Sequence, residues 1–268
     1  MKYIKLNNGI EIPLIGIGTN TFGKVNNNYN GEINYDTTEL NYAIDLGYRL
    51  LDTAISYRNE AVIGKAVMES NINREEFIIT TKLPGEKYVL VKDIDVVLAE
   101  SLRNLNTTYL DILLIHHPWD NDEEMIKVYK HLENWVRTGA IKSIGVSNFS
   151  IEQINLIVDN CEIVPAINQI ASYPTNYQDE LIEHCQKLGI TVQAWSPLNR
   201  VSEEMKTVLN QIGERYGKTW AQVLLKYQVS RNVVVIPKSH RYEGQKENLN
   251  IFDFKLTNLE KNLIKNLK

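Results

Sequence analysis

The chain has 268 residues, a formal net charge of −4 and 43% hydrophobic residues. This composition is ordinary for a soluble globular protein, and the length fits one α/β barrel or two modest domains. The slight acidity, with no long block of Lys or Arg, argues against nucleic acid or an anionic membrane as the main partner. No apolar run approaches the ~20 residues of a membrane span.

The N-terminus mixes charged residues and Asn into its apolar residues, so it is not read as a signal peptide. The two cysteines, Cys161 and Cys185, form neither a metal-ligand pattern nor a disulfide framework, and no metal site is expected. We therefore expect a cytoplasmic protein with reduced thiols.

The first residues predict a β-hairpin. The apolar runs YIKL and IEIPLI flank Asn8-Gly9, the favoured pair for a type I′ turn. After this hairpin, short β-like runs alternate with amphipathic helical segments. The eight β-like runs are 15–18, 48–52, 77–82, 111–116, 143–148, 165–169, 191–196 and 233–239. Several of them are apolar at consecutive positions, as strands covered on both faces must be.

Helical patterns occupy the segments between the runs. In 91–105, apolar residues fall on one helical stripe. The segments that begin at Ser150 and Thr257 each have Gln or Glu three residues later, which is typical of a capping box. Two further helices are expected over 202–217 and 219–229 with no strand between them.

The alternation and the absence of a linker predict a single (β/α)8 barrel domain over 1–268, with the hairpin closing its bottom. The competing fold is a doubly wound sheet, whose phosphate loop should read G-x-G-x-x-G after the first strand. Here the run is GIGTNT, with Thr21 where the third Gly should stand. We therefore favour the closed barrel.

Chemically capable side chains follow nearly every predicted strand. In such a barrel the active site lies at the carboxyl ends of the strands. The residues there are Asp52, Lys82, His116, Ser147, Asn148, Gln169, Trp195, Ser196, Lys238 and Ser239, and Tyr57 lies in a short loop after the second strand. One polar strand end would mean little, but the repetition indicates a reaction site.

Four of these residues suggest proton transfer. A free tyrosine has a pKa of ~10, and a neighbouring Lys82 cation, held by Asp52, should lower the pKa of Tyr57. His116 could donate a hydrogen bond to a substrate oxygen. Each residue alone has a simpler reading: an interior ion pair for Asp52 and Lys82, a packed aromatic for Tyr57, a core histidine for His116. Together they read as a general acid with the groups that tune it.

The motifs DTAISYRNE, TTKL, DILLIHHP, GVSNF, NQ, AWSPL and IPKS resemble those of the aldo-keto reductase family in order and approximate spacing. The resemblance covers Gly16 to Leu256 and is nearest to short bacterial members of the diketogulonate reductase and prostaglandin F synthase-like type. It implies a barrel enzyme that reduces small carbonyl compounds with a nicotinamide cofactor and acts as a monomer. It also implies Tyr57 as the general acid, with Asp52, Lys82 and His116 completing a catalytic tetrad.

The resemblance further implies a set of cofactor contacts. Ser147, Asn148 and Gln169 would hold the nicotinamide carboxamide, and Trp195 would stack on its ring. The remaining contacts would come from Thr19, Ser196, Leu198, Lys238, Ser239, Glu247 and Asn248. Many relatives have an arginine six residues after the lysine, where this chain has Gly244. We therefore expect NADPH to be preferred by a reduced margin, with NADH usable and with Arg241 or His240 as substitutes.

Several departures concern the substrate pocket. The family usually has aromatic residues where this chain has Asn20 and His117, so the pocket should be polar and roomy. The loop between Gly23 and Tyr35 looks longer than usual and could act as a lid. The sequence ends directly after the last predicted helix, so the C-terminal loop that closes the pocket in many relatives is expected to be missing. These features predict broad, weak binding of aldehydes and dicarbonyls.

Two other functions remain open. One is a redox-sensing subunit that binds the nicotinamide nucleotide with little turnover. The other is a Schiff-base aldolase that uses Lys82, but it leaves the other strand-end motifs unexplained.

Overall fold

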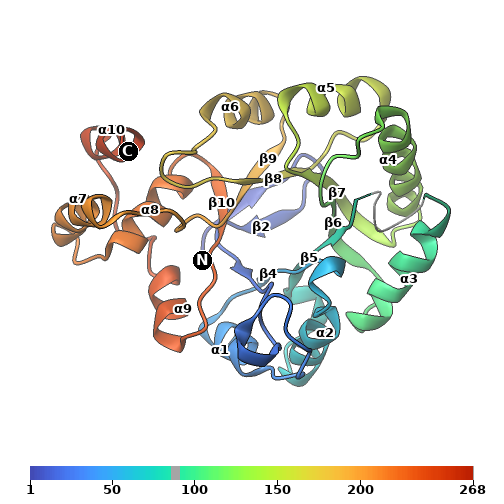
Figure 1. The fold of residues 1–268 in the computed structure, drawn as a ribbon, viewed down its shortest axis with the longest axis horizontal. Helices are drawn as coiled ribbons and strands as arrows, with labels where there is room; N and C mark the ends of the chain where they lie inside the picture. The colour runs from blue at the N-terminus through green and yellow to red at the C-terminus, as the bar shows by residue number, and fades with distance from the viewer. Residues whose placement is uncertain (86–90, 268) are drawn as a thin grey trace.

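The computed structural model describes residues 1–85 and 91–267, and its centre is a barrel of eight parallel strands (Figure 1). Each strand pairs with the next one along the chain. The strands are β3 (Ile17–Gly18), β4 (Leu50–Asp52), β5 (Ile78–Leu83), β6 (Leu110–Ile115), β7 (Ile141–Ser147), β8 (Ile167–Ala171), β9 (Thr191–Trp195) and β10 (Val233–Ile236). All eight predicted strands are present, which confirms the (β/α)8 barrel.

The barrel closes between its first and last strands. Ile15 pairs with Val235 in an isolated parallel bridge. The Gly16 amide donates to the Val235 carbonyl at 2.9 Å, and the Gly18 amide donates to the Pro237 carbonyl at 3.1 Å. The last strand ends before Pro237, which lacks an amide proton, so the predicted run to 239 is too long. Lys238 and Ser239 consequently lie in the loop that follows β10.

Helices surround the barrel (Figure 1). They are α1 (Thr38–Leu46), α2 (Glu60–Glu69), α3 (Ile94–Asn104), α4 (Asp122–Arg137), α5 (Ile151–Asn160), α6 (Asp179–Lys187), α7 (Glu203–Glu214), α8 (Trp220–Val229), α9 (Tyr242–Leu249) and α10 (Asn258–Lys265). The predicted capping boxes at Ser150 and Thr257 are both formed. The helices expected at 202–217 and 219–229 are α7 and α8, and no strand separates them.

The hydrophobic core has two layers around the barrel strands, and a third cluster lies among α7, α8 and α10. The larger layer lies between the strands and the helices and includes Ile94 and Leu98 of the predicted stripe in α3. The smaller layer fills the barrel interior with Leu50, Ile112 and Val234. Both faces of each strand are therefore covered, which explains the consecutive apolar residues in the strand sequences.

The N-terminal hairpin, β1 (Tyr3–Lys5) and β2 (Glu11–Pro13), lies across the barrel. Its Leu6 and Ile12 belong to the interior cluster, and the Asn8 side chain donates to the carbonyl of Lys142 just after the first residue of β7. Since this is the amino end of the strand, the hairpin closes the bottom as predicted.

The predicted type I′ turn is wrong. That turn needs positive φ at both central residues, and here Gly9 has φ 90° while Asn8 does not adopt positive φ. The Gly9 amide donates to the Leu6 carbonyl instead, as in a tight turn followed by one left-handed glycine.

Within the described ranges, no helix combines the length and apolar character needed to cross a membrane. Both cysteines are free thiols; Cys185 is buried and Cys161 is half-buried.

Candidate active site

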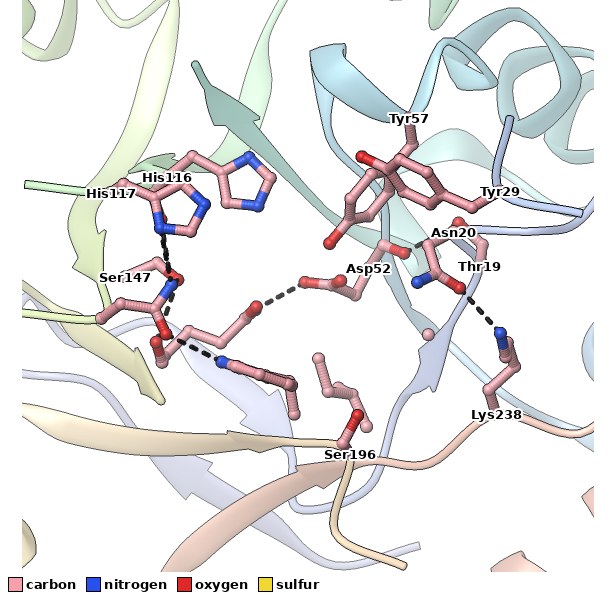
Figure 2. A pocket seen from close by; sticks show the side chains of 15 residues that line it. Thr19, Asn20, Tyr29, Asp52, Tyr57, His116, His117, Ser147, Ser196 and Lys238 are labelled. Atoms are coloured by element: carbon pink, nitrogen blue, oxygen red, sulfur yellow. Dashed lines mark hydrogen bonds between the residues drawn. The ribbon is translucent and has the colours of Figure 1, made fainter. Parts of the chain in front are cut away.

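A cavity of about 310 Å³ opens at the carboxyl ends of the strands (Figure 2). Its lining includes most of the residues predicted from the sequence. They are Thr19, Asn20, Asp52, Tyr57, His116, His117, Ser147, Asn148, Gln169, Trp195, Ser196 and Lys238, with Gly18, Tyr29 and Ile236 in addition. Residues between Gly18 and Lys238 that lie far apart in the sequence therefore meet at one site, as the strand-end pattern predicts.

Lys82 lies just behind this lining and is fully buried. Its Nζ donates to Asp52 Oδ1 at 2.7 Å and to the Thr53 carbonyl at 2.8 Å. Burial alone would lower the pKa of Lys82, but the Asp52 carboxylate and Tyr57 together outweigh burial and raise it. The ammonium group is therefore charged and fixed, and its third direction points to the Tyr57 hydroxyl at 3.5 Å.

Tyr57 ends a short 3-10 helix, η2 (Ile55–Tyr57), that follows β4. The next loop is secured by Asn59, whose side chain donates to the Thr19 and Phe22 carbonyls. Burial raises the pKa of Tyr57, and the Lys82 charge opposes this rise without reversing it. The predicted lowering of the Tyr57 pKa is therefore wrong for this state of the protein, because desolvation exceeds the attraction of a lysine 3.5 Å away.

His116 and His117 stack beside Tyr57. Their rings are nearly parallel, with centroids 4.6 Å apart, and His116 meets the Tyr57 ring edge-on at 5.6 Å. Burial, with help from the charges of Lys82 and His117, lowers the pKa of His116 to about 3. His116 is therefore a neutral imidazole near pH 7, able to donate one hydrogen bond but not to supply a positive charge.

The Trp195 indole fixes the orientation of Asn148. Its Nε1 can only donate, and it lies 3.0 Å from Asn148 Oδ1. Asn148 Nδ2 therefore points the other way, with the Ser147 hydroxyl at 3.0 Å, the His116 carbonyl at 3.1 Å and His117 Nδ1 at 3.3 Å. Burial also lowers the pKa of His117, so the ring is neutral near pH 7 and one of its two nitrogens can donate a hydrogen bond. Asn148 itself adopts the left-handed conformation, with φ 63°.

Gln169 joins this arrangement to the ion pair. Its Nε2 donates to Asp52 Oδ2 at 2.6 Å and to Gln193 Oε1 at 2.7 Å. Asp52 thus receives Lys82 on one oxygen and Gln169 on the other. Gln193 was not predicted as a site residue, although a glutamine within the apolar strand run TVQAW is a usable signal.

Lys238 reaches across the cavity mouth. Its Nζ donates to Asn20 Oδ1 at 2.9 Å and to Thr21 Oγ1 at 3.0 Å. Since a lysine only donates, Asn20 must present Oδ1 to it, which leaves the Asn20 amide protons for the cavity (Figure 2).

Five of the predicted site residues are not in the cavity lining: Lys82, Leu198, Ser239, Glu247 and Asn248. Glu247 accepts a 2.5 Å hydrogen bond from Thr219, and Asn248 is buried in α9. Ser239 Oγ is hydrogen-bonded to the backbone of Arg241.

Tyr29 lines the cavity and was missed in the sequence. It lies in the long loop after Gly23, and its ring meets Tyr57 at 5.9 Å. The available signal was a single aromatic residue inside the asparagine-rich run VNNNYN.

Comparisons with known proteins agree with this geometry. Glyoxal reductase of Bacillus subtilis is 37% identical over 257 residues, covering 95% of this chain and 88% of that protein. Methylglyoxal reductase DkgA of Escherichia coli K12 is 33% identical, covering 94% and 88%. A crystal structure of an aldo/keto reductase from Brucella melitensis superimposes with a TM-score of 0.91 at 32% identity, covering 100% of this chain and 99% of that one.

A Bombyx mori aldo-keto reductase, crystallised in complex with NADP, superimposes with a TM-score of 0.88 at 33% identity, covering 98% and 92%. The model of the Aldo/keto reductase family matches residues 14–268. The barrel, the strand-end cavity and these matches agree, and the chain belongs to the aldo/keto reductase family.

Proposed function

We propose that this protein reduces aldehydes and ketones to alcohols with NADPH, and that Tyr57 is the general acid. The observation that carries the proposal is the buried Lys82 ammonium. Two of its directions are taken by Asp52 and Thr53, and the third points to the Tyr57 hydroxyl in the cavity wall. An ion pair with a purely structural role would not require a tyrosine hydroxyl next to the ammonium group.

The residues of the cavity fit a nicotinamide carboxamide. Gln169 uses its Nε2 on Asp52 and Gln193, so its Oε1 is the atom left to accept from an amide. Asn148 and Ser147 are adjacent, and the hydrogen bond from Trp195 to Asn148 holds the indole in the cavity wall. A flat aromatic ring there suits a flat heterocycle. When bound, the nicotinamide would supply the hydride that reaches the carbonyl carbon.

The side chains of the tetrad would handle the oxygen of the substrate. As the carbonyl carbon is reduced, its oxygen becomes an alkoxide and needs a proton. Tyr57 would donate that proton, and Lys82 would stabilise the phenolate that remains. His116, neutral at pH 7, would orient the oxygen through one hydrogen bond.

Two further donors suggest short dicarbonyl compounds among the substrates. The neutral His117 ring can donate one hydrogen bond, and Asn20 has its amide protons left for the cavity. Both can bind a second oxygen beside the reacting carbonyl. Two of the relatives are a glyoxal reductase and a methylglyoxal reductase, which supports this choice.

The test is Tyr57→Phe, with Lys82→Met as a second variant. Tyr57→Phe should bind NADPH normally but lose reduction of methylglyoxal by a factor of ~10² or more, the range that general acid catalysis supplies. Lys82→Met should behave similarly. Near-normal turnover by Tyr57→Phe would show that the tetrad is misassigned. Binding of NADPH without turnover in the unmodified protein would instead favour a redox-sensing subunit.

The preference for NADPH should depend on Arg241 rather than on His240. A side chain at Gly244 would start 2.4 Å from Ser239 Oγ, so an arginine does not fit there without displacing Ser239. Arg241 Nη2 lies 3.8 Å from the same point. His240 is already engaged by Glu39 at 2.5 Å and by Thr21 at 3.0 Å. Arg241 is therefore the cation available beside Lys238 for a 2′-phosphate.

Binding measured by nicotinamide fluorescence tests this assignment. Arg241→Ala should weaken NADPH by about tenfold and leave NADH nearly unchanged, because only NADPH carries the 2′-phosphate. Lys238→Ala should lower the preference further. The matched control is Lys246→Ala, an exposed cation in α9, the helix that begins directly after Arg241. Equal losses for the two cofactors in Arg241→Ala would refute a phosphate-reading role.

A further inference from the structure

The loop after Gly23 is a small structured hairpin, here called the 24–33 hairpin. Lys24 and Ile33 form an antiparallel bridge, and the Val25 amide donates to the Glu32 carbonyl at 2.9 Å. A 3-10 turn, η1 (Val25–Asn27), begins it. The backbone of the 24–33 hairpin therefore has its own hydrogen bonds, which define the position of its tip.

Two cations fasten the tip of the 24–33 hairpin. Arg58, the residue after Tyr57, donates from Nη2 to the Tyr29 carbonyl at 3.1 Å and to the Gly31 carbonyl at 3.2 Å. Lys24 is 2% exposed, and its Nζ donates to the Tyr29 carbonyl at 2.7 Å while lying 4.6 Å from the Tyr29 ring centroid. Both hold the same residue, and one of them is adjacent in sequence to the proposed acid.

The fastened residue enters the active site. Tyr29 lines the cavity, and its ring meets the Tyr57 ring edge-on at 76°. Figure 2 shows Tyr29 beside Tyr57, on the side of the cavity away from His116 and His117. Tyr29 is still 42% exposed, so part of the residue has no protein covering. An uncovered aromatic surface next to the reacting position is suited to an apolar part of a ligand.

We propose that Tyr29 is a specificity-determining residue, whose ring binds the aromatic or apolar substituent of the carbonyl substrate. Arg58 is a positioning residue that acts through the Tyr29 backbone. This inference rests on the proposed carbonyl reduction and adds a preferred substrate class, namely aryl and other apolar aldehydes. It also modifies the expectation of a polar pocket, because one wall of the cavity is aromatic.

The test compares two substrates. Benzaldehyde has a ring that can pack on Tyr29, whereas methylglyoxal has only a methyl group. Tyr29→Ala should raise KM for benzaldehyde about threefold to tenfold, the size expected for one lost aromatic pair. KM for methylglyoxal, and NADPH affinity by fluorescence, should change less than about twofold. Tyr29→Phe should keep the KM of the unmodified protein, since the ring remains.

Two more variants separate position from bulk. Arg58→Met leaves Tyr29 intact but removes both hydrogen bonds to the hairpin, and it should raise KM for benzaldehyde with kcat nearly unchanged. Tyr29→Leu keeps bulk if Tyr29→Ala fails to fold, and it should still lose part of the benzaldehyde preference. The matched control is Tyr35→Ala, a tyrosine of the same segment that is 54% exposed and absent from the cavity lining.

The outcomes distinguish the two proposals. An unchanged benzaldehyde KM in Tyr29→Ala, or equal changes for both substrates, would overturn the role of Tyr29 while carbonyl reduction stands. An unmodified protein that reduces neither aldehyde with either cofactor would overturn both.

Discussion

His116 occupies a place where protonation is unfavourable, because burial and the neighbouring Lys82 and His117 lower its pKa to about 3. In the unfolded chain the same imidazole titrates near pH 6.5. Between these values the unfolded chain binds a proton that the folded chain does not. The free energy of unfolding should therefore fall as the pH is lowered from 6.5 towards 3.

The expected slope gives a measurable effect. One such group contributes up to about 1.4 kcal/mol per pH unit, so urea unfolding at pH 7, 6, 5 and 4 should show the loss. His116→Gln has no titrating group there, and its free energy of unfolding should decline less over this range. Parallel declines for the two proteins would contradict the low pKa of His116.

The positions of Asp52, Lys82 and His116 could be predicted because each lies at a strand end that the apolar pattern marks, and Tyr57 follows one of these ends by a short turn. The pKa of Tyr57 could not. Its direction depends on how far burial exceeds the Lys82 charge, and a sequence does not contain the 3.5 Å separation or the degree of burial. The Gln169–Asp52 hydrogen bond joins residues 117 positions apart, so it also needs the fold.

Among the elements, α5 connects helix capping to the site. Ser150 Oγ accepts from the Gln153 amide at 3.3 Å, and Gln153 Oε1 accepts from the Ser150 amide at 2.9 Å. Asn148 lies two residues before this cap. The start of α5 is thus fixed close to one of the proposed carboxamide contacts.

Loss of this cap should be visible in stability. Ser150→Ala should lower the free energy of unfolding by about 1 kcal/mol, the usual effect of removing an N-cap side chain. Ser150→Asn supplies another good cap and should recover most of the loss. Chemical denaturation of the three proteins checks this, and an unaltered midpoint in Ser150→Ala would argue against the cap.

Elements with local signals were predictable, and elements made by distant contacts were not. The capping boxes need only residues three apart, and those at Ser150 and Thr257 were found from the sequence, whereas a third, between Thr219 and Gln222, was missed. The 24–33 hairpin depends on Arg58, which donates to Tyr29 across 29 positions of sequence, and its asparagines give no clear β pattern. The N-terminal hairpin was predicted, but its turn type depended on the φ of Asn8.

At the scale of the whole molecule, the barrel could be predicted because eight alternations of strand and helix leave few parallel architectures. Closure of the barrel, however, cannot be predicted from any single segment of the sequence. The bonds that close the barrel join residues 14–18 to residues 235–237, which are more than 200 positions apart. The first strand has only two paired residues, Ile17 and Gly18, so this junction has little local support.

The junction between β3 and β10 also runs beneath the site. Lys238 follows β10, Asn20 and Thr21 follow β3, and the bonds from Lys238 to these two side chains cross the line of closure. A nucleotide that contacts both sides of that line would bridge β3 and β10 and help to keep the barrel closed. Its binding energy would then oppose local opening of the junction.

Hydrogen exchange at single amides can detect this stabilisation of the β3–β10 junction. The amides of Gly16, Gly18 and Val235 make the closing bonds, and they should exchange more slowly when NADPH is added. Amides in the middle of β6 serve as the reference, because β6 lies between two full-length strands. Their exchange should slow only as much as NADPH raises the free energy of unfolding of the whole protein. If all of these amides slowed by the same factor, the junction would have no separate opening. A larger effect at the junction would mean that the barrel opens locally between β3 and β10, and that the bound nucleotide stabilises this junction against opening.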